Sequence, residues 1–236
     1  MAVKVEPFKQ KIIDIKRGFT HAYEILFRLT LENIIIPCSP EKVISYIERF
    51  GSLEDFELTI LEKALEKANG DMLFFNISPK NLNERFLIEA IKLVNIYNGK
   101  VVFEITESAP LKDLKLAEDL MTQFKSDHVK FAIDDFGSGY TSFSYLERLP
   151  VDYIKIDGKY IKSLPHSQKT FSLVKTFVQL ANTIGVKTVA EYVENKTILN
   201  IVKDLGFDYA QGFYIDEPKP FVHKKEKELS YYEPSI

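Results

Sequence analysis

Two adjacent acids, Asp134 and Asp135, stand at the end of a short apolar run and directly before the glycine loop Gly137-Ser138-Gly139. The apolar run predicts a buried strand, and the glycines give the backbone freedom that a tight loop needs. Successive strand residues point to opposite faces, so both acids can serve one site only if the chain begins to turn at the second. A solvated turn is the alternative interpretation, since Asp, Ser and Gly are common turn residues.

Polar residues stand at or near the ends of most other apolar runs as well. They are acids, amides and one lysine: Glu24, Asn76, Glu104, Glu107, Asp134, Asp135, Lys155, Asp157, Glu191, Glu194 and Gln211. Any one of them alone could be a surface residue. Brought together, the carboxylates would repel one another unless cations neutralised them. Oxygen donors without histidine or thiolate favour a hard divalent cation, Mg²⁺ or Mn²⁺, and the number of carboxylates predicts two ions.

Lys155 is the one cation in this set, and it stands between apolar residues in the segment VDYIKID. We expect its ammonium to enter the site, where it could orient an attacking water or contact a phosphate oxygen. A structural lysine in a salt bridge is the alternative. The four histidines show no metal-ligand spacing such as His-Glu-x-x-His, so they offer no competing site.

The order of the apolar runs predicts an α/β fold, because short runs alternate with longer amphipathic ones. Eight strands are expected, over 9–15, 22–28, 72–77, 101–106, 129–134, 153–157, 186–193 and 209–213, and eight strands suggest a barrel. Helices are expected over 40–49, 53–68, 84–94, 111–125, 171–184 and 196–204. The short turn Lys16-Arg17-Gly18 allows the first two strands to run antiparallel. In such barrels the active site lies at the carboxyl ends of the strands.

Composition narrows the class of protein further. The 236 residues, 45% of them hydrophobic, can bury a large core, and we expect one domain over 1–222 with a charged tail over 223–236. The formal net charge of −3 gives no basic field for binding a DNA or RNA polymer. Cys38 is the only cysteine, which excludes an internal disulfide. The absence of a signal peptide and of a membrane span leads us to expect a cytoplasmic protein.

Seven motifs together resemble the EAL domain family, bacterial phosphodiesterases of the second messenger cyclic di-GMP. They are EILFR (24–28), FNIS (75–78), FEITES (103–108), DDFGSGYTS (134–142), LPVDYIKID (149–157), AEYVE (190–194) and AQGF (210–213). Each motif alone is weak, whereas seven in order with matched spacing are highly specific. The resemblance extends from Gln10 to about Pro220.

The resemblance implies a TIM-like (β/α)8 barrel with one antiparallel strand, and it implies roles for particular residues. Glu24, Asn76, Glu104 and Asp134 would hold one metal ion, and Asp134 would bridge to a second ion held also by Asp135 and Glu191. Lys155 would position the water between the ions. Gln10, Leu26, Arg28, Asp157 and Gln211 would contact the dinucleotide or support its site. Glu107 would hold the loop from Asp135 to Ser142, which in the family links the site to a homodimer interface.

Four positions depart from the family pattern. Ile25 replaces alanine, Tyr192 replaces glycine, Leu29 replaces an aromatic residue and Lys11 replaces proline. Tyr192 matters most because it follows Glu191. On a regular strand its ring would point away from the lumen, into the layer between strands and helices. If the strand has already turned at Glu191, the ring would lie at the edge of the pocket and could stack on a guanine or block it. We expect the tyrosine to be tolerated.

Three functions remain open at this point. The leading hypothesis is a metal-dependent phosphodiesterase that opens cyclic di-GMP to linear pGpG. The alternative is a catalytically weak or inactive EAL domain that binds cyclic di-GMP, or a sensory or regulatory protein partner, without turnover. A barrel lyase or aldolase that uses Lys155 is the least favoured, because it leaves the set of motifs unexplained.

Overall fold

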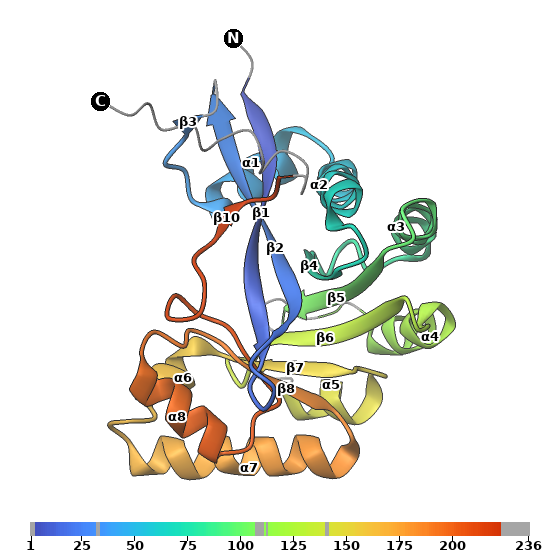
Figure 1. Cartoon of the computed structure of the whole chain (residues 1–236). Helices are drawn as coiled ribbons and strands as arrows, with labels where there is room; N and C mark the ends of the chain where they lie inside the picture. Colours follow the sequence, from blue (N-terminus) through green and yellow to red (C-terminus); the bar gives the residue numbers. More distant parts are fainter. Residues whose placement is uncertain (1–2, 32–33, 107–110, 112, 140–141, 223–236) are drawn as a thin grey trace, which may run out of the picture.

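The computed structural model describes residues 3–31, 34–106, 111, 113–139 and 142–222. Eight strands close into a barrel in the order β1-β9-β8-β7-β6-β5-β4-β2, with β2 returning to β1 (Figure 1). Their bounds are β1 Lys4–Asp14, β2 Thr20–Leu31, β4 Met72–Ile77, β5 Lys100–Thr106, β6 Val129–Phe136, β7 Tyr153–Ile156, β8 Lys187–Ala190 and β9 Tyr209–Ala210. The predicted (β/α)8 barrel is confirmed.

Strand β1 is the antiparallel member of the barrel. It pairs antiparallel with β2 through a long hairpin and antiparallel with β9, whereas the pairs from β2 through β4 to β9 are parallel. The hairpin turns at Gly18, whose φ of 74° suits glycine. Two short strands were not predicted: β3 (Ile34–Ile35) pairs antiparallel with the end of β2, and β10 (Lys219–Pro220) pairs antiparallel with β1. The single antiparallel strand expected from the hairpin is therefore confirmed.

Helices cover the outside of the barrel, as Figure 1 shows for α2, α3, α4 and α7. Their bounds are α1 Pro40–Phe50, α2 Leu53–Ala68, α3 Glu84–Ile96, α4 Leu114–Phe124, α5 Ser142–Arg148, α6 Gly158–Ser163, α7 Gln168–Ile184 and α8 Lys196–Asp204. Side-chain caps start several of them, for example Asn83 at α3 and Asn195 at α8. The six predicted helices are present. The short helices α5 and α6 were not predicted, because six or seven residues carry little periodic signal.

The strands alternate between two apolar layers. Residues such as Leu73 and Phe75 of β4 pack outward in the large core between barrel and helices. The alternate residues form a separate buried cluster inside the barrel: Ile12, Ala22, Phe74, Val102, Ala132, Tyr153 and Val189. This inner cluster closes the lumen, so a site above it opens only toward the carboxyl ends of the parallel strands.

Two further expectations concern a membrane span and the charged tail. No helix within the described ranges has the length and apolar character to cross a membrane. The charged tail, 223–236, lies outside the described residues, so the division into a barrel domain and a tail stays a prediction.

Candidate active site

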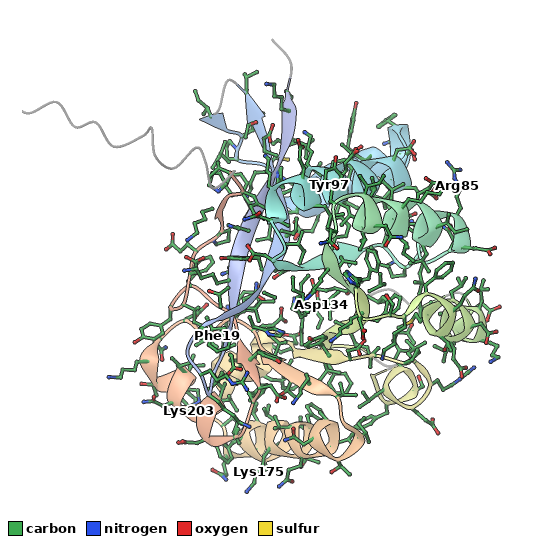
Figure 2. The ribbon with its side chains drawn as sticks, turned by 45° about the vertical axis from the view of Figure 1, so that its right-hand side comes forward. Phe19, Arg85, Tyr97, Asp134, Lys175 and Lys203 are labelled. Carbon is green, nitrogen blue, oxygen red and sulfur yellow. The ribbon has the colours of Figure 1, made fainter. Side chains whose placement is uncertain are left out.

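The polar residues of the site form a layer directly above the apolar layer that fills the barrel. Glu24, Asn76, Glu104, Asp134, Lys155 and Glu191 each follow by two residues a member of the inner apolar cluster, and Gln10 precedes Ile12 by two because β1 runs the other way. Side chains two apart on a strand point to the same face. All seven therefore point into the lumen at one level, and Figure 2 labels Asp134 near the middle of the view.

Lys155 lies at the centre of this level. Its Nζ is 2.9 Å from Glu104 Oε1, 2.9 Å from Asp134 Oδ1 and 3.0 Å from Glu191 Oε1, with Glu24 Oε2 at 3.7 Å. Lys155 and Glu104 are fully buried, with relative exposures of 0%. A buried ammonium is tolerated only when it is paired, and here it meets carboxylates from β2, β5 and β6 and from the residue that follows β8. Lys155 thus forms salt bridges and also lies within the site. Both interpretations of the sequence, a structural lysine and a site ammonium, apply to it.

Asp135 joins the same cluster through a change in backbone conformation. Its φ is 54°, in the left-handed region, and the pairing of β6 with β7 shifts between Ile133 and Phe136. This bulge turns the second acid toward the lumen side. Ligand oxygens of Asp134, Asp135 and Glu191 consequently lie within 4.8 Å of one another. The turn that two adjacent acids require is present at Asp135.

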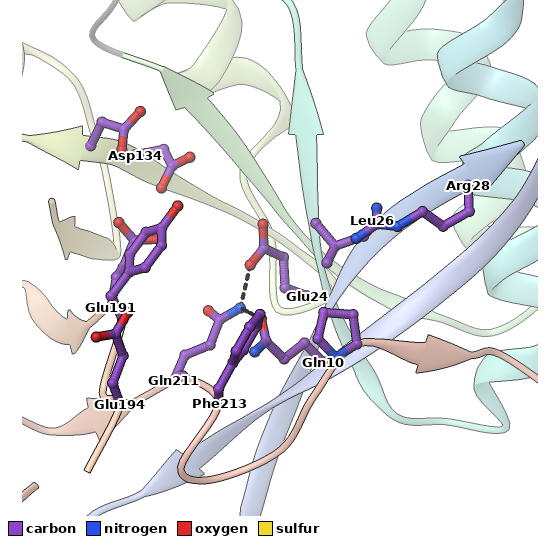
Figure 3. A pocket seen from close by; sticks show the side chains of 13 residues that line it. Gln10, Glu24, Leu26, Arg28, Asp134, Glu191, Glu194, Gln211 and Phe213 are labelled. Carbon is purple, nitrogen blue, oxygen red and sulfur yellow. Dashed lines mark hydrogen bonds between the residues drawn. The ribbon is translucent and has the colours of Figure 1, made fainter. Parts of the chain in front are cut away.

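Amide side chains hold the other wall of the site. Gln211 Nε2 donates to Glu24 Oε2 and, at 2.8 Å, to Gln10 Oε1, as the dashed lines in Figure 3 show. Gln10 Nε2 donates to the backbone oxygen of Asp216 at 2.8 Å, and Asn76 Nδ2 donates to Glu24 Oε1 at 3.0 Å. Both oxygens of Glu24 are therefore oriented by amides, and its carboxylate is fixed in direction.

The electrostatics of the cluster favour additional positive charge. Burial raises the pKa of Glu104 and of Glu191 well above the ordinary value, although Lys155 opposes the rise. Burial together with the charges of Asp134 and Asp157 raises the pKa of Asp135 to about 6. Burial alone would lower the pKa of Lys155, but the surrounding carboxylates outweigh it and the pKa is raised well above its usual value. The single positive charge of Lys155 cannot neutralise the five carboxyl groups of Glu24, Glu104, Asp134, Asp135 and Glu191 when they are ionised.

The donor atoms fit hard divalent cations. Among the described residues, Glu104 Oε2, Glu191 Oε2 and Gln211 Oε1 are buried without a hydrogen-bond partner. Buried oxygens of this kind are rarely left without a partner or an ion. The set holds carboxylate and amide oxygens and no sulfur or imidazole, which is the chemistry that Mg²⁺ and Mn²⁺ prefer. The residues present therefore fit the metal ions that the motifs implied.

Two hollows flank the acid cluster. One of about 360 Å³ is lined on one side by Gln10 and Glu24 and on the other by Glu191 and Tyr192. The second, of about 480 Å³, lies between β2, α1, α2 and β4 and has a mostly apolar lining. Leu26, Arg28, Asp134 and Asp135 line both hollows. A ligand that spans them would thus cross directly over the acids.

The sequence matches a known protein family. The sequence model of the EAL domain family matches residues 4–218 of the chain. The chain belongs to the EAL domain family.

The chain is also similar to a curated relative with a named activity. The cyclic di-GMP phosphodiesterase PdeA of Borreliella burgdorferi is 33% identical over 224 residues, which cover 90% of this chain and 33% of that protein. The chain thus spans about a third of the length of this curated relative.

Solved EAL structures share the fold. The FimX EAL domain of Pseudomonas aeruginosa bound to c-di-GMP aligns with a TM-score of 0.81 and 23% identity, covering 92% of this chain and 91% of that one. The calcium and cyclic di-GMP complex of Klebsiella pneumoniae BlrP1 aligns with a TM-score of 0.79 and 22% identity, covering 92% of this chain and 56% of that one. At these identities the likeness shows a shared barrel.

Some residues singled out from the EAL motifs lie apart from the cluster. Asp157 caps α6, where its Oδ1 accepts from Lys159 N at 2.7 Å, and it lines neither hollow. Glu194 lines the first hollow but pairs with Lys162 at 3.1 Å. Glu107 lies outside the described residues. Their roles in substrate binding or loop support stay predictions.

Tyr192 corrects one expectation. Strand β8 ends at Ala190, and Tyr192 has a φ of 50°, so the regular strand geometry that would point its ring into the layer between strands and helices is wrong. The chain leaves the sheet early because Gln211 O accepts from Val193 N, which pulls the segment toward the end of β9. The ring is 52% exposed and lines the first hollow.

Phe213 and Pro218 also line this hollow, and neither was singled out as a site residue. The motif AQGF contained a signal for Phe213. Gly212, with φ 156°, approaches the Val193 backbone so closely that an added Cβ would lie 2.2 Å from Val193 N. Only glycine fits there, and the next side chain, Phe213, is left 65% exposed at the rim.

Proposed function

We propose that this EAL domain is a cyclic di-GMP phosphodiesterase that opens one phosphodiester of the cyclic dinucleotide to give linear pGpG with Mg²⁺ or Mn²⁺. The observation that carries the proposal is the position of Lys155, within 3.0 Å of Glu104, Asp134 and Glu191 beside the turned Asp135. The named activity of the relative PdeA supports the choice of substrate.

The carboxylate and amide oxygens divide between two ion sites. We assign Glu24, Asn76, Glu104 and Asp134 to one ion and Asp135 and Glu191, with Asp134 shared, to the other. When bound, two such ions supply a reactive hydroxide at neutral pH and neutralise charge that develops on the phosphoryl oxygens.

Residues of the chain prepare the reaction around those ions. Lys155 is the one buried side-chain ammonium at this level in the described chain, so its charge can oppose the developing negative charge. Its three N–H groups point to Glu104, Asp134 and Glu191, so one of them would leave its carboxylate to donate to the attacking water. The amides of Gln10 and Gln211 hold Glu24 in direction, which keeps a ligand from rotating. Arg28 lines both hollows, and its guanidinium suits a phosphate oxygen.

The two hollows fit a ligand with two bases and central phosphates. Because they share Leu26, Arg28, Asp134 and Asp135, a dinucleotide that places one base in each hollow would bring a phosphodiester over the acids. The apolar lining of the second hollow, with Phe75 and Ile60, suits the flat face of a base.

One experiment tests the proposal directly. Purified chain is incubated with cyclic di-GMP and Mg²⁺ or Mn²⁺, and the products are separated by chromatography. Linear pGpG should form, and excess EDTA should stop its formation. A preparation that binds cyclic di-GMP but yields no linear product with either ion would overturn the enzymatic part.

A receptor that binds cyclic di-GMP without turnover is the second candidate. The exposed ring of Tyr192 at the rim of the first hollow favours it, since a bulky side chain beside Glu191 can hinder the approach of a phosphodiester. The same incubation separates the two candidates. A homodimer and a sensory or regulatory partner also stay proposals, and light scattering with and without the dinucleotide tests the first.

A further inference from the structure

The ring of Tyr192 is held in place from one side by helix α6. An added Cβ on Gly158 would lie 2.1 Å from Tyr192 Cδ2 and 2.6 Å from Cγ, so the ring rests directly on the glycine. Lys162 Nζ lies 4.3 Å from the ring centroid and pairs with Glu194 at 3.1 Å. Gly158 and Lys162 are four residues apart and thus share one face of α6. The ring is supported along this face.

The rest of the ring borders the first hollow. Tyr192 lines this hollow together with Phe213, and their exposures of 52% and 65% leave both with large apolar surfaces open. Hydrogen bonds from Val193 N to Gln211 O, 2.9 Å, and from Tyr214 N to Val193 O, 3.1 Å, fix the two segments beside each other. Two aromatic residues therefore stand at the rim of one hollow on neighbouring, tied segments.

The hollow has acids at its floor and aromatic rings at its rim. Asp134, Asp135 and Glu191 line the same hollow as Tyr192, which follows Glu191 in sequence. A nucleotide whose phosphate lies over the acids carries its base on the adjoining sugar, so the base can reach the rim. Stacking on an aromatic ring is the common way in which proteins hold an unpaired base.

We propose that Tyr192 is a specificity-determining residue of this chain, whose ring, supported by Gly158 and Lys162, stacks on one guanine of the cyclic dinucleotide. The inference rests on the proposed function for the identity of the ligand. It also explains why a tyrosine occupies a left-handed backbone position that favours glycine. The cost in backbone conformation is offset by support from α6 and, in the complex, by stacking.

The absence of tryptophan from the chain allows a direct optical test. A Tyr192→Trp variant carries a single indole at the rim, and cyclic di-GMP should quench its fluorescence in a saturable titration. The titration uses Ca²⁺, the ion of the BlrP1 complex, to follow binding separately from turnover. Tyr46→Trp is the matched control, because Tyr46 is an exposed tyrosine of α1 that lines neither hollow. Its signal should not change.

Affinity variants complete the test by calorimetry under the same conditions. Tyr192→Phe keeps the ring and should bind within about twofold of wild type, whereas Tyr192→Ala should bind about tenfold more weakly or worse, the range of a lost base stack. Tyr46→Ala should bind as wild type does. Melting curves confirm that each variant is folded.

The outcomes separate this inference from the proposed function. If wild type binds cyclic di-GMP and Tyr192→Ala binds equally or more tightly, the stacking role is wrong while the phosphodiesterase proposal stands on its own assay. If wild type binds and Tyr192→Ala is weakened, the stacking role holds whether or not linear product forms. If wild type neither binds nor hydrolyses the dinucleotide, both proposals are overturned.

Discussion

Asp135 and Tyr192 share a left-handed backbone conformation, with φ values of 54° and 50°. Asp135 follows the inward-pointing Asp134 of β6, and Tyr192 follows Glu191, the first residue after β8. In each case the residue before it, Asp134 or Glu191, ends the regular alternation of a strand. The turn brings Asp135 into the acid cluster and leaves Tyr192 at the rim of a hollow. The same local conformation thus supplies a ligand at one strand end and an aromatic wall at the other.

Asp135→Asn should remove a ligand without disturbing the backbone. Asparagine is among the residues that tolerate the left-handed region, so the bulge in β6 should persist. We expect turnover to fall by about a hundredfold or more, because the loss of a charged ligand weakens the binding of one metal ion. That ion would lower the free energy of the transition state by several kcal/mol by neutralising the charge that develops there. Turnover with varied Mn²⁺ measures the effect.

Asp135→Ala is the matched variant for the backbone. It removes the same carboxylate but strains the left-handed position, so its melting temperature should be lower than that of Asp135→Asn by roughly 2 to 4 °C. Equal melting temperatures would show that the conformation at Asp135 costs little.

Asp134→Asn should abolish hydrolysis and leave the barrel folded. The change is nearly isosteric and removes charge from the residue assigned to both ions, which also contacts Lys155 Nζ at 2.9 Å. Circular dichroism checks the fold, and product formation at saturating metal checks the activity. Turnover close to wild type at saturating Mg²⁺ or Mn²⁺ would sink the two-ion assignment.

Lys155→Ala should reduce kcat far more than it raises KM. If Lys155 acts on the attacking water and on charge that forms in the transition state, ground-state binding depends little on it. Initial rates over a range of cyclic di-GMP concentrations separate the two constants. A defect confined to KM would instead assign Lys155 to a phosphate contact.

Lys155→Met adds a stability measurement to the kinetic one. Without the ammonium, Glu104, Asp134 and Glu191 lose their buried partner, and removing one member of a buried ion pair costs about 3 to 5 kcal/mol. The variant should therefore melt well below wild type in EDTA and recover more than wild type does when Mg²⁺ is added. An equal metal effect in both proteins would argue against the shared cluster.

Much of the site follows from the period-two pattern of the strands. Once a strand is predicted and its buried lumen residue is known, the residue two positions along must point into the site, as Phe74 and Asn76 or Val102 and Glu104 show. The barrel, the antiparallel hairpin and most of the acid list were accessible from the sequence for this reason.

The residues whose positions were predicted wrongly lie where the chain departs from the period-two pattern of a strand. Strand β8 was expected over 186–193 but ends at Ala190, since the left-handed Tyr192 and the hydrogen bonds to the segment after β9 interrupt it. Asp157 stood in a strand-end motif, yet its carboxylate caps α6. Tertiary contacts and capping decide such positions, and neither is written in local periodicity.

Glu57 is a buried acid outside the cluster that fixes the loop after β4. Its Oε1 accepts from Ser78 N at 2.9 Å and its Oε2 accepts from Asn81 Nδ2 at 2.8 Å, so α2 holds the segment that follows Asn76. Burial raises the pKa of Glu57 to about 7, although both hydrogen bonds oppose the rise. Folding thus extends the pH range in which the Glu57 carboxyl keeps its proton.

The raised pKa of Glu57 makes stability depend on pH in a definite direction. Between the unfolded value of 4.5 and about 7, the folded state binds more protons than the unfolded state, so the free energy of unfolding falls as pH rises. Glu57→Gln cannot titrate. The stability of Glu57→Gln relative to wild type should therefore rise by about 2 kcal/mol between pH 5 and pH 8. Urea denaturation of both proteins in EDTA at the two pH values gives this difference, and Glu62→Gln, on the exposed side of α2, serves as the control. A relative stability that is unchanged between pH 5 and pH 8 would show that Glu57 is ionised in the folded chain at both.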